Sequence, residues 1–320
     1  MTENAVPPRH VVVPDRLKTI KRYTPPVVKQ VARASLRRYG VRTASSRPLP
    51  TFLVIGTKRG GTTSLWNWLL KHPAVAPQFP AAQQIKSPHY FDINFWRGEQ
   101  WYRSHFPTQR ALDRLATSLG GRPAVGEASP YYMFHPAAPQ RVAELMPDVR
   151  LIVLLRDPVA RAYSNFAERR GSGAEPLTVF EDALEAEATR LEGEEAKILA
   201  DPRYYSAHHD SHTYLARGRY IEHFRPWLDA FSREQMLIIR SEDQAADPAA
   251  AFAQVQQFLG IPLRDIVDLQ RHNRLPRNPL KPETERWLAD YYQPYNARLY
   301  EALGRDFGWE ALHRDTKHTP

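Results

Sequence analysis

Short apolar runs alternate along the chain with longer stretches in which apolar residues recur at helical spacing. A parallel strand is buried on both faces and is therefore apolar throughout, so we predict strands at residues 52–55, 124–127, 150–155 and 236–239. Helical periodicity predicts helices at residues 62–71, 136–146, 159–170, 219–231 and 248–259. Strands that alternate with helices predict an α/β fold, a P-loop-like parallel β-sheet flanked by α-helices.

The first 50 residues differ from the rest of the chain in charge. They contain 11 Lys and Arg residues and 2 Asp and Glu residues, while residues 51–320 contain 33 of each kind. The formal net charge of +9 therefore belongs to this segment. We predict a basic, partly helical N-terminal arm at residues 1–50 and a single domain at residues 51–320. Because the domain has no excess of positive charge, we do not expect it to bind nucleic acid.

Within the arm, Val28, Val31, Ala32 and Leu36 lie near helical spacing among basic residues. So narrow an apolar stripe favours a short helix packed on the domain with its charges in water. The alternative is a basic amphipathic helix on an anionic membrane surface or on a partner. No apolar run approaches the roughly 20 residues of a membrane span, and the N-terminus lacks the apolar core of a signal peptide. We therefore expect a cytoplasmic protein, with peripheral contact at the inner face of the membrane as the alternative.

The segment "GTKRGGTTS" at residues 56–64 joins the first predicted strand to the first predicted helix. Its glycines let backbone N–H groups turn towards one point, and a helix N-terminus adds unpaired donors and a positive dipole end. Gly56 and Gly61 fit the spacing of the Walker pattern, but Thr62 stands where that pattern has lysine. Lys58 lies earlier in the loop, where it could reach the oxygen that bridges a phosphate to a group being transferred. The pattern predicts a phosphate cradle of a different kind.

A second candidate anion site follows the predicted strand at residues 150–155. Arg156 ends this strand, and Ser164 comes about two turns into the helix that begins after Asp157. An arginine at the carboxyl edge of a parallel sheet faces the ligand crevice, so Arg156 and Ser164 could hold a second phosphate. An ion pair of Arg156 with Asp157 or with another nearby acidic residue is the structural alternative.

The loop "TKRGGTTSL" and the segment "RDPVARAYS" together resemble sulfotransferases that use 3′-phosphoadenosine 5′-phosphosulfate (PAPS). The segments "KSPHYFDINFWRGEQWYRSHFP", "GEASPYYMFHP" and "YNARLYEALGRDFGW" are similar to bacterial relatives of the heparan-sulfate and carbohydrate enzymes. The resemblance covers about residues 51–310. It implies one sulfotransferase-type domain that takes PAPS as donor, releases 3′,5′-ADP and needs no metal.

The resemblance also implies a role for individual residues. The first loop would hold the 5′-phosphosulfate, with Lys58 at the transfer point, and Arg156 and Ser164 would hold the 3′-phosphate. A late basic loop, "RHNRLPRN", would cover the nucleotide through Arg274 and Arg277. The residues implied for the first loop are Lys58, Arg59, Gly60, Gly61, Thr62, Thr63 and Ser64.

The sequence departs from the heparan-type pattern on the acceptor side. Ser87 stands where those enzymes have the glutamate that acts as base, and Ala128 stands where they have a lysine. Serine cannot act as a general base at neutral pH, so another residue must take the proton. We consider Glu127, which we expect at the rim of the crevice, and His89, which titrates in the right range. Asp92 is a third candidate, and Lys86 could orient the sulfate.

The acceptor itself is not named by the sequence. The resemblance favours a saccharide or glycolipid, and small hydroxylated metabolites are the alternative. We expect an acceptor cleft lined in part by aromatic residues, with the others in the core: Trp96, Trp101, Tyr102, Tyr131 and Tyr132.

Two polar segments lie outside these motifs. The histidines of "HHDSH" (208–212) are interpreted as solvated loop residues rather than a metal site, since no tight second ligand cluster accompanies them. The acidic residues 181–195 are interpreted as a solvated helical face. The chain has no cysteine, which excludes disulfides and thiolate metal sites.

Two other functions fit parts of the pattern. A P-loop nucleotide kinase would explain the glycine-rich loop, but Thr62 replaces its lysine and Arg156 stands where its magnesium site should be. A non-catalytic nucleotide-binding scaffold, recruited through the basic arm, would explain the serine at position 87. It predicts that 3′,5′-ADP binds and that no acceptor is sulfated.

Overall fold

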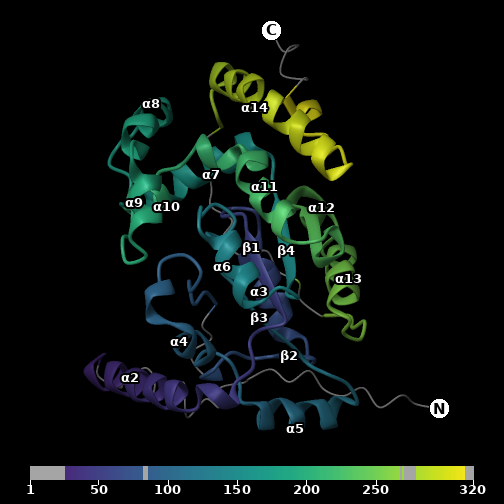
Figure 1. Cartoon of the computed structure of the whole chain (residues 1–320). Helices are drawn as coiled ribbons and strands as arrows, with labels where there is room; N and C mark the ends of the chain where they lie inside the picture. Colours follow the sequence, from purple (N-terminus) through teal and green to yellow (C-terminus); the bar gives the residue numbers. More distant parts are fainter. Residues whose placement is uncertain (1–25, 82–85, 267–268, 270–278, 314–320) are drawn as a thin grey trace, which may run out of the picture.

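The computed structural model describes residues 26–81, 86–266, 269 and 279–313. Its described part contains one parallel sheet of five strands in the order β2-β3-β1-β4-β5 (Figure 1). The strands are β1 (Phe52–Gly56), β2 (Val75–Ala76), β3 (Ala124–Ala128), β4 (Arg150–Leu155) and β5 (Met236–Arg240). The four predicted strands are confirmed to within one residue, and so is the α/β fold class. β2 is too short to leave an apolar pattern, and we did not predict it.

Helices surround the sheet, and the five predicted ones are confirmed to within two residues as α3, α6, α7, α11 and α13. No helix in the described ranges combines the length and the apolar character needed to cross a bilayer. The described helices are α2 (Pro26–Arg42), α3 (Thr62–Lys71), α4 (Glu99–Arg103), α5 (Gln109–Leu119), α6 (Ala138–Leu145), α7 (Pro158–Gly171), α8 (Phe180–Leu191), α9 (Glu194–Ala200), α10 (Ala207–Ser211), α11 (Tyr220–Ala230), α12 (Ser241–Ala246), α13 (Pro248–Leu259) and α14 (Pro282–Leu303).

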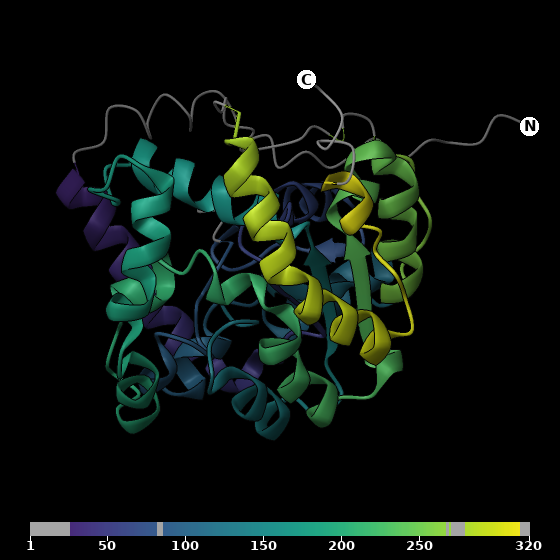
Figure 2. The same cartoon turned by 90° about the horizontal axis from the view of Figure 1, so that it is seen from above.

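Alternate residues of each strand point to opposite faces of the sheet, and the two faces pack into different cores. Leu53 and Ile55 of β1 pack with residues of α6, α11 and α14. Phe52 and Val54 pack on the other face with residues of α3 and α13. Figures 1 and 2 show the resulting arrangement, in which helices cover both faces and α14 lies along one of them. Both faces of β1 are therefore dry, as its continuous apolar run predicts.

The strand order places a ligand crevice at the carboxyl end of β1. The chain passes from β1 to β2 and β3 on one side and then to β4 and β5 on the other. Such a reversal leaves an opening between the loops that leave neighbouring strands, and ligands of open α/β sheets bind there. The loops that follow β1, β3 and β4 leave the sheet at this edge, and they carry most of the predicted site residues.

The acidic segment 181–195 is not simply a solvated face. Glu187 on α8 is buried, and its carboxylate accepts hydrogen bonds from the backbone N–H groups of Leu215 and Ala216, each at 2.7 Å. Tyr214 N–H donates to the same group at 2.5 Å. The prediction was wrong for this residue because its partners lie about 28 residues further along the chain. Glu187 fixes the loop that follows α10.

Candidate functional site

The phosphate loop joins β1 to α3 through residues 57–61, as predicted. Gly61 precedes the helix with φ of +96°, in the region that favours glycine. A Cβ atom at this position would lie 2.4 Å from Oε1 of the buried Gln244. No other residue fits this turn without strain. The turn aims the N-terminus of α3, with its positive dipole end, at the crevice.

The two predicted phosphate-binding motifs meet at one place. Arg59 Nε in the first loop donates a hydrogen bond of 3.0 Å to the Ser164 hydroxyl on α7. Arg156 Nη1 donates to the backbone oxygen of Arg59 at 3.2 Å. Arg156 therefore lies against the loop, where burial lowers its pKa and the nearby carboxylates of Glu242 and Asp157 partly offset this lowering. Residues about 100 positions apart in the chain thus form one cationic corner beside the phosphate loop.

Lys58 lies on the other side of the loop, where its ammonium group forms an ion pair with the Asp210 carboxylate on α10. The ammonium group also donates to the Asp210 backbone oxygen at 3.1 Å and lies 4.9 Å from the centre of the Tyr131 ring. Burial lowers the pKa of Lys58 to about 8, with the nearby Arg217 acting in the same direction and Asp210 against it. Sequence reasoning did not find Asp210, because 152 residues separate the two partners.

A second lysine contacts the start of α3. Lys86 Nζ donates to the Thr63 hydroxyl at 2.9 Å and lies 3.3 Å from the Thr62 hydroxyl. Burial lowers the pKa of Lys86 to about 8, and the positive charge of Lys58 lowers it further. Lys86 thus contacts the helix N-terminus through hydroxyl groups, whereas the charge of Lys58 is paired with Asp210.

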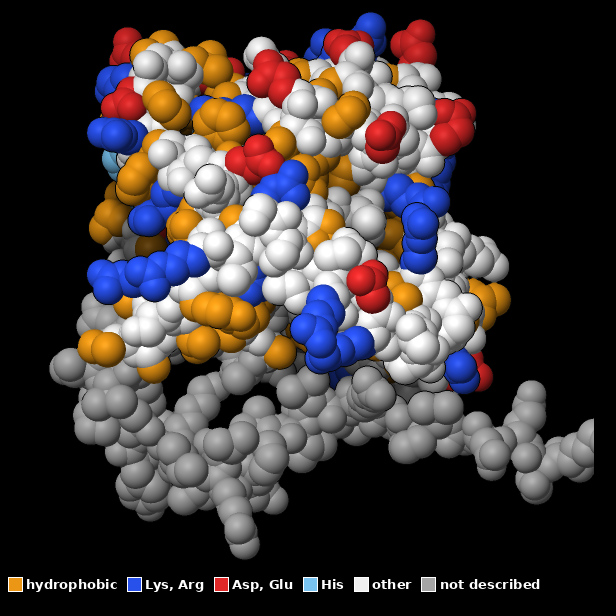
Figure 3. Space-filling view, turned by 60° about the horizontal axis from the view of Figure 1, so that its bottom comes forward, with side chains coloured by type: hydrophobic (Ala, Val, Ile, Leu, Met, Phe, Trp, Pro, Cys, Tyr) orange, Lys and Arg blue, Asp and Glu red, His pale blue; other side chains and the backbone are white. Residues whose placement is uncertain are grey.

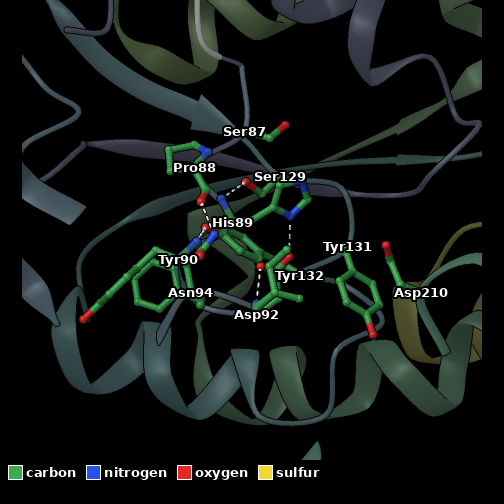
Figure 4. Close-up of polar contacts among 12 residues, drawn as sticks. Ser87, Pro88, His89, Tyr90, Asp92, Asn94, Ser129, Tyr131, Tyr132 and Asp210 are labelled. Atoms are coloured by element: carbon green, nitrogen blue, oxygen red, sulfur yellow. Dashed lines mark hydrogen bonds and ion pairs between the residues drawn. The ribbon is translucent and has the colours of Figure 1, made fainter. Parts of the chain in front are cut away.

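His89 and Asp92 form a polar pair beside the loops that follow β3 (Figure 4). His89 Nδ1 lies 2.7 Å from Asp92 Oδ2, and the backbone N–H of His89 donates to the Ser129 hydroxyl at 3.2 Å. Burial lowers the pKa of His89, but the Asp92 carboxylate more than offsets this, so the pKa lies above its ordinary value. The imidazole is 26% exposed, whereas the Asp92 side chain is fully covered. Because Asp92 holds Nδ1, the ring nitrogen left for proton exchange with a ligand is Nε2.

Glu127 does not lie at the crevice rim, and that expectation was wrong. It is the fourth residue of β3 and is fully buried. Its carboxylate accepts hydrogen bonds from Ser129 at 2.6 Å, Tyr132 at 2.6 Å and Tyr102 at 3.2 Å. Burial raises the pKa of Glu127 to about 7, while the bonds from Ser129 and Tyr132 lower it. Because Ser129 also holds the His89 backbone, Glu127 acts as an internal support for the His89 segment.

Comparison with known proteins identifies the family of the chain. The family model described as "Sulfotransferase domain" matches residues 49–286. The chain belongs to the sulfotransferase domain family. The predicted resemblance is confirmed.

Individual relatives of this sulfotransferase come from animals, amoebae and bacteria. Heparan sulfate glucosamine 3-O-sulfotransferase 3B1 of Mus musculus is 30% identical over 292 residues, covering 83% of this chain and 66% of that protein. Membrane-associated sulfotransferase kil1 of Dictyostelium discoideum is 28% identical, covering 82% and 67%. The chain thus spans about two thirds of the length of these relatives. The crystal structure of a sulfotransferase from Alicyclobacillus acidocaldarius is 28% identical with a TM-score of 0.61, covering 82% of this chain and 99% of that one.

Ser87 and Ala128, the two positions where the sequence differs from the heparan-type pattern, are in contact. The Ser87 hydroxyl donates a hydrogen bond to the backbone oxygen of Ala128, and the Ala128 N–H donates to the Lys86 backbone oxygen at 3.1 Å. A glutamate and a lysine at these two positions would be neighbours of opposite charge. His89 and Asp92 form a polar pair shortly after Ser87 in the same segment.

The other predicted residues are placed as follows. Of the aromatic residues proposed for the cleft, Tyr102 and Tyr132 are buried around Glu127, Tyr131 lies under Lys58, and Trp96 is 45% exposed. The segment 208–212 forms α10, and His209 and His212 are buried rather than solvated, which corrects the prediction. His209 Nδ1 lies 2.7 Å from the Tyr131 hydroxyl.

Some predictions concern residues that the structure does not describe. Arg274 and Arg277 lie outside the described residues, so their proposed contact with the nucleotide stays a prediction. The division of the chain at residue 50 also stays a prediction.

Proposed function

We propose that this protein transfers a sulfuryl group from PAPS to a hydroxyl or amine group of an acceptor, with a saccharide or glycolipid as the acceptor class. The observation that carries the proposal is the junction of the two phosphate-binding motifs, where Arg59 bonds to Ser164 and Arg156 contacts the loop. Membership of the family supports it, and so does the saccharide named for the murine relative.

The donor side fits the charge of PAPS. Lys58 and Lys86 are buried next to a helix N-terminus, and the pKa of each is lowered to about 8. An anion bound between them would reverse this shift, because an opposite charge favours the protonated lysine. We propose that residues 58–64 hold the 5′-phosphosulfate and that Arg156 and Ser164 hold the 3′-phosphate. PAPS supplies an activated sulfuryl group, and no residue described above needs a metal for its role.

In this proposal, His89, Asp92 and Lys58 take part in proton transfer and charge stabilisation. His89 Nε2 takes the proton from the acceptor O–H or N–H, and Asp92 holds Nδ1 protonated and stabilises the imidazolium that forms. Lys58 leaves Asp210 and stabilises the charge that develops on the oxygen between sulfur and the 5′-phosphate as that bond breaks. The acceptor atom forms the new bond to sulfur, and 3′,5′-ADP leaves. Glu127 remains a weaker candidate for the base because its carboxylate is buried.

Binding of 3′,5′-ADP tests the donor side directly. We expect millimolar 3′,5′-ADP to raise the melting temperature, and Arg156→Ala or Lys58→Ala to weaken the effect. The exposed Arg225 pairs with Asp229 away from the loop, so Arg225→Ala is the matched control. An unchanged melting temperature contradicts the proposal. Stabilisation by ATP with magnesium, but not by 3′,5′-ADP, would indicate the kinase instead.

Incubation with labelled PAPS and a panel of glycans, glycolipids and phenolic metabolites tests the acceptor side. We expect sulfated product from at least one acceptor and a loss of about 10²–10⁴-fold in turnover for His89→Ala, the range for a general base. Asp92→Asn should retain donor binding but lower turnover, which separates a positioning effect from misfolding. Binding of 3′,5′-ADP without any sulfated product would favour the non-catalytic scaffold.

The location of the enzyme is part of the proposal. We propose that it works in the cytoplasm and that its basic arm contacts the inner face of the membrane, where a glycolipid acceptor would be present. The name of the Dictyostelium relative, a membrane-associated sulfotransferase, supports the membrane contact.

A further inference from the structure

Helix α2 packs on the domain through a polar side and leaves apolar residues in solvent. The Arg37 guanidinium donates to the Ser104 backbone oxygen at 2.7 Å and to its hydroxyl at 2.9 Å. Gly40 lies so close to the same residue that a Cβ atom would be 2.9 Å from the Ser104 oxygen. The side of the helix that faces the protein is thus defined by Arg37 and Gly40. The helix packs on the domain, as expected, but the Arg37 charge lies in this contact rather than in water.

Away from this contact, α2 exposes three large apolar side chains together with Arg38 and Arg42. Val31 is 60% exposed, Tyr39 is 55% exposed and Leu36 is 38% exposed. Val31, Ser35 and Tyr39 follow one another at four-residue steps, so they lie along one face of the helix. Large apolar side chains on a helix normally face the core. Here Val31 is mostly exposed, and Tyr39 is half exposed although its ring lies 6.1 Å from the Phe79 ring.

All charged residues of α2 are basic. α2 contains five Lys and Arg residues and no Asp or Glu, and Arg38 and Arg42 are exposed beside Val31. Figure 3 shows hydrophobic side chains gathered beside a row of Lys and Arg side chains on the left of the molecule, the side on which Figure 1 places α2. Apolar residues flanked by basic ones are the pattern of a helix that lies in a membrane interface.

We infer that the outward face of α2, with Val31, Leu36 and Tyr39, inserts into an anionic lipid surface. A second copy of the chain is a poor occupant, because a symmetric contact would bring the five basic residues of one helix against five of another. Residues 1–25 carry five Lys and Arg residues and two Asp and Glu residues, so they too repel this face. An anionic bilayer instead supplies both an apolar interior and the opposite charge.

The inference deepens the proposed membrane contact in one respect. Arg37 and Gly40 fix α2 to the domain, so a bilayer that receives α2 also receives the domain in one orientation. A flexible basic tail would bind through charge alone. The inference rests on the location proposed above, but it requires neither donor binding nor turnover.

Sedimentation with lipid vesicles tests the inference on the full chain. The vesicles are phosphatidylcholine alone, and phosphatidylcholine mixed with phosphatidylglycerol in equal parts. We expect binding to the mixed vesicles only, and a loss of about tenfold or more in affinity for the double variant Val31→Ser with Leu36→Ser. The matched control is Leu199→Ser with Leu263→Ser, which removes two similarly exposed leucines, 57% and 58% exposed, from other parts of the surface. This control should bind as the unchanged protein does.

Three outcomes would overturn the inference. The first is an absence of binding to mixed vesicles, and the second is equal binding of the double variant, which would indicate charge alone. The third is a dimer in light scattering that the double variant converts to a monomer, which would assign the face to a second copy. Stabilisation by 3′,5′-ADP, measured on the same samples, shows that each variant is folded and reports separately on the proposed function.

Discussion

The ion pair between Lys58 and Asp210 makes a quantitative prediction about the proposed transfer residue. Asp210→Asn removes the negative charge and keeps the shape of the side chain. Asp210 supplies both of the influences that raise the pKa of Lys58, its charge and a hydrogen bond. Burial and the charge of Arg217 lower this pKa and remain after the substitution. The pKa of Lys58 should therefore fall below its present value of about 8.

The size of the fall follows from the contact geometry. Both side chains are 15% exposed, so water screens the pair only in part. An opposite charge in contact shifts a pKa by about 1–3 units, and we expect the lower part of this range, about 1–2 units or about 1.4–2.8 kcal/mol. At pH 7.5 Lys58 is mostly protonated in the unchanged protein, and it would be mostly neutral in Asp210→Asn. Asp210 thus acts as a positioning residue that keeps Lys58 charged before the donor arrives.

Competitive labelling with acetic anhydride measures this pKa without any substrate. The rate at which Lys58 is acetylated follows its neutral fraction, and mass spectrometry of the peptide reports it between pH 6 and pH 10. We expect a midpoint near 8 in the unchanged protein and a midpoint about 1–2 units lower in Asp210→Asn. Tyr205→Phe is the matched control, because Tyr205 donates to the same carboxylate at 3.1 Å and its loss leaves the charge in place.

The same midpoint in Asp210→Asn and in the unchanged protein would refute the coupling. A lower midpoint in Tyr205→Phe as well would show that any disturbance of α10 has the same effect, which would refute the assignment to charge. Calorimetric titration with 3′,5′-ADP gives a second measure. Because the Asp210 carboxylate competes with a bound phosphate for Lys58, the variant should bind more tightly wherever Lys58 is charged in both proteins.

Three further changes test other parts of the site and fold. Gly61→Ala places a Cβ atom 2.4 Å from Gln244 Oε1 at a φ of +96°, so chemical denaturation should show a loss of about 1–3 kcal/mol in unfolding free energy, and 3′,5′-ADP should stabilise the variant less. His313 lies 3.2 Å from Asp157 and 2.8 Å from Glu285; burial lowers its pKa, but the two carboxylates raise it to about 9. The contribution of His313 to the unfolding free energy is then complete below the unfolded pKa of about 6.5, and it is lost as the pH rises through about 9. His313→Gln should therefore lower the unfolding free energy by about 1–3 kcal/mol at pH 6 and by much less at pH 10. Ser87→Glu should destabilise the protein, and adding Ala128→Lys should recover part of the loss in a double-mutant cycle, because the two positions are in contact.

The strands and the phosphate loop could be predicted because their signals are local. Residues 151–155 form an uninterrupted apolar run, and β4 has the predicted bounds of 150–155. The glycines of the loop are adjacent in sequence to the helix that they start. β2 could not be predicted, since two residues are too few to show an alternation. The outward apolar face of α2 could not be predicted either, because spacing identifies a stripe and not the side on which the domain lies.

The site residues that the sequence missed depend on contacts between distant segments. Asp210 reaches Lys58 from a helix 152 residues away, and no spacing rule joins them. Glu127 was expected at the rim because it precedes a turn-like segment. The strand instead continues to Ala128, and Tyr102 of α4 covers the carboxylate from a separate part of the chain. Charge and titration range alone therefore favoured Glu127 and His89 equally, and burial separates them.

The residues at positions 87 and 128 are compatible with the proposal that His89 is the base. A glutamate at position 87 without a lysine at 128 would leave a partly buried charge unpaired, which costs several kcal/mol. Replacing both by small residues removes that cost, and Ser87 instead satisfies the Ala128 carbonyl. His89 lies two residues further along the same loop, with Asp92 2.7 Å from Nδ1 and the Ser129–Glu127 pair beneath its backbone. If the proposed function holds, the acceptor side has one oriented proton acceptor, His89, and the proposed chemistry requires only one.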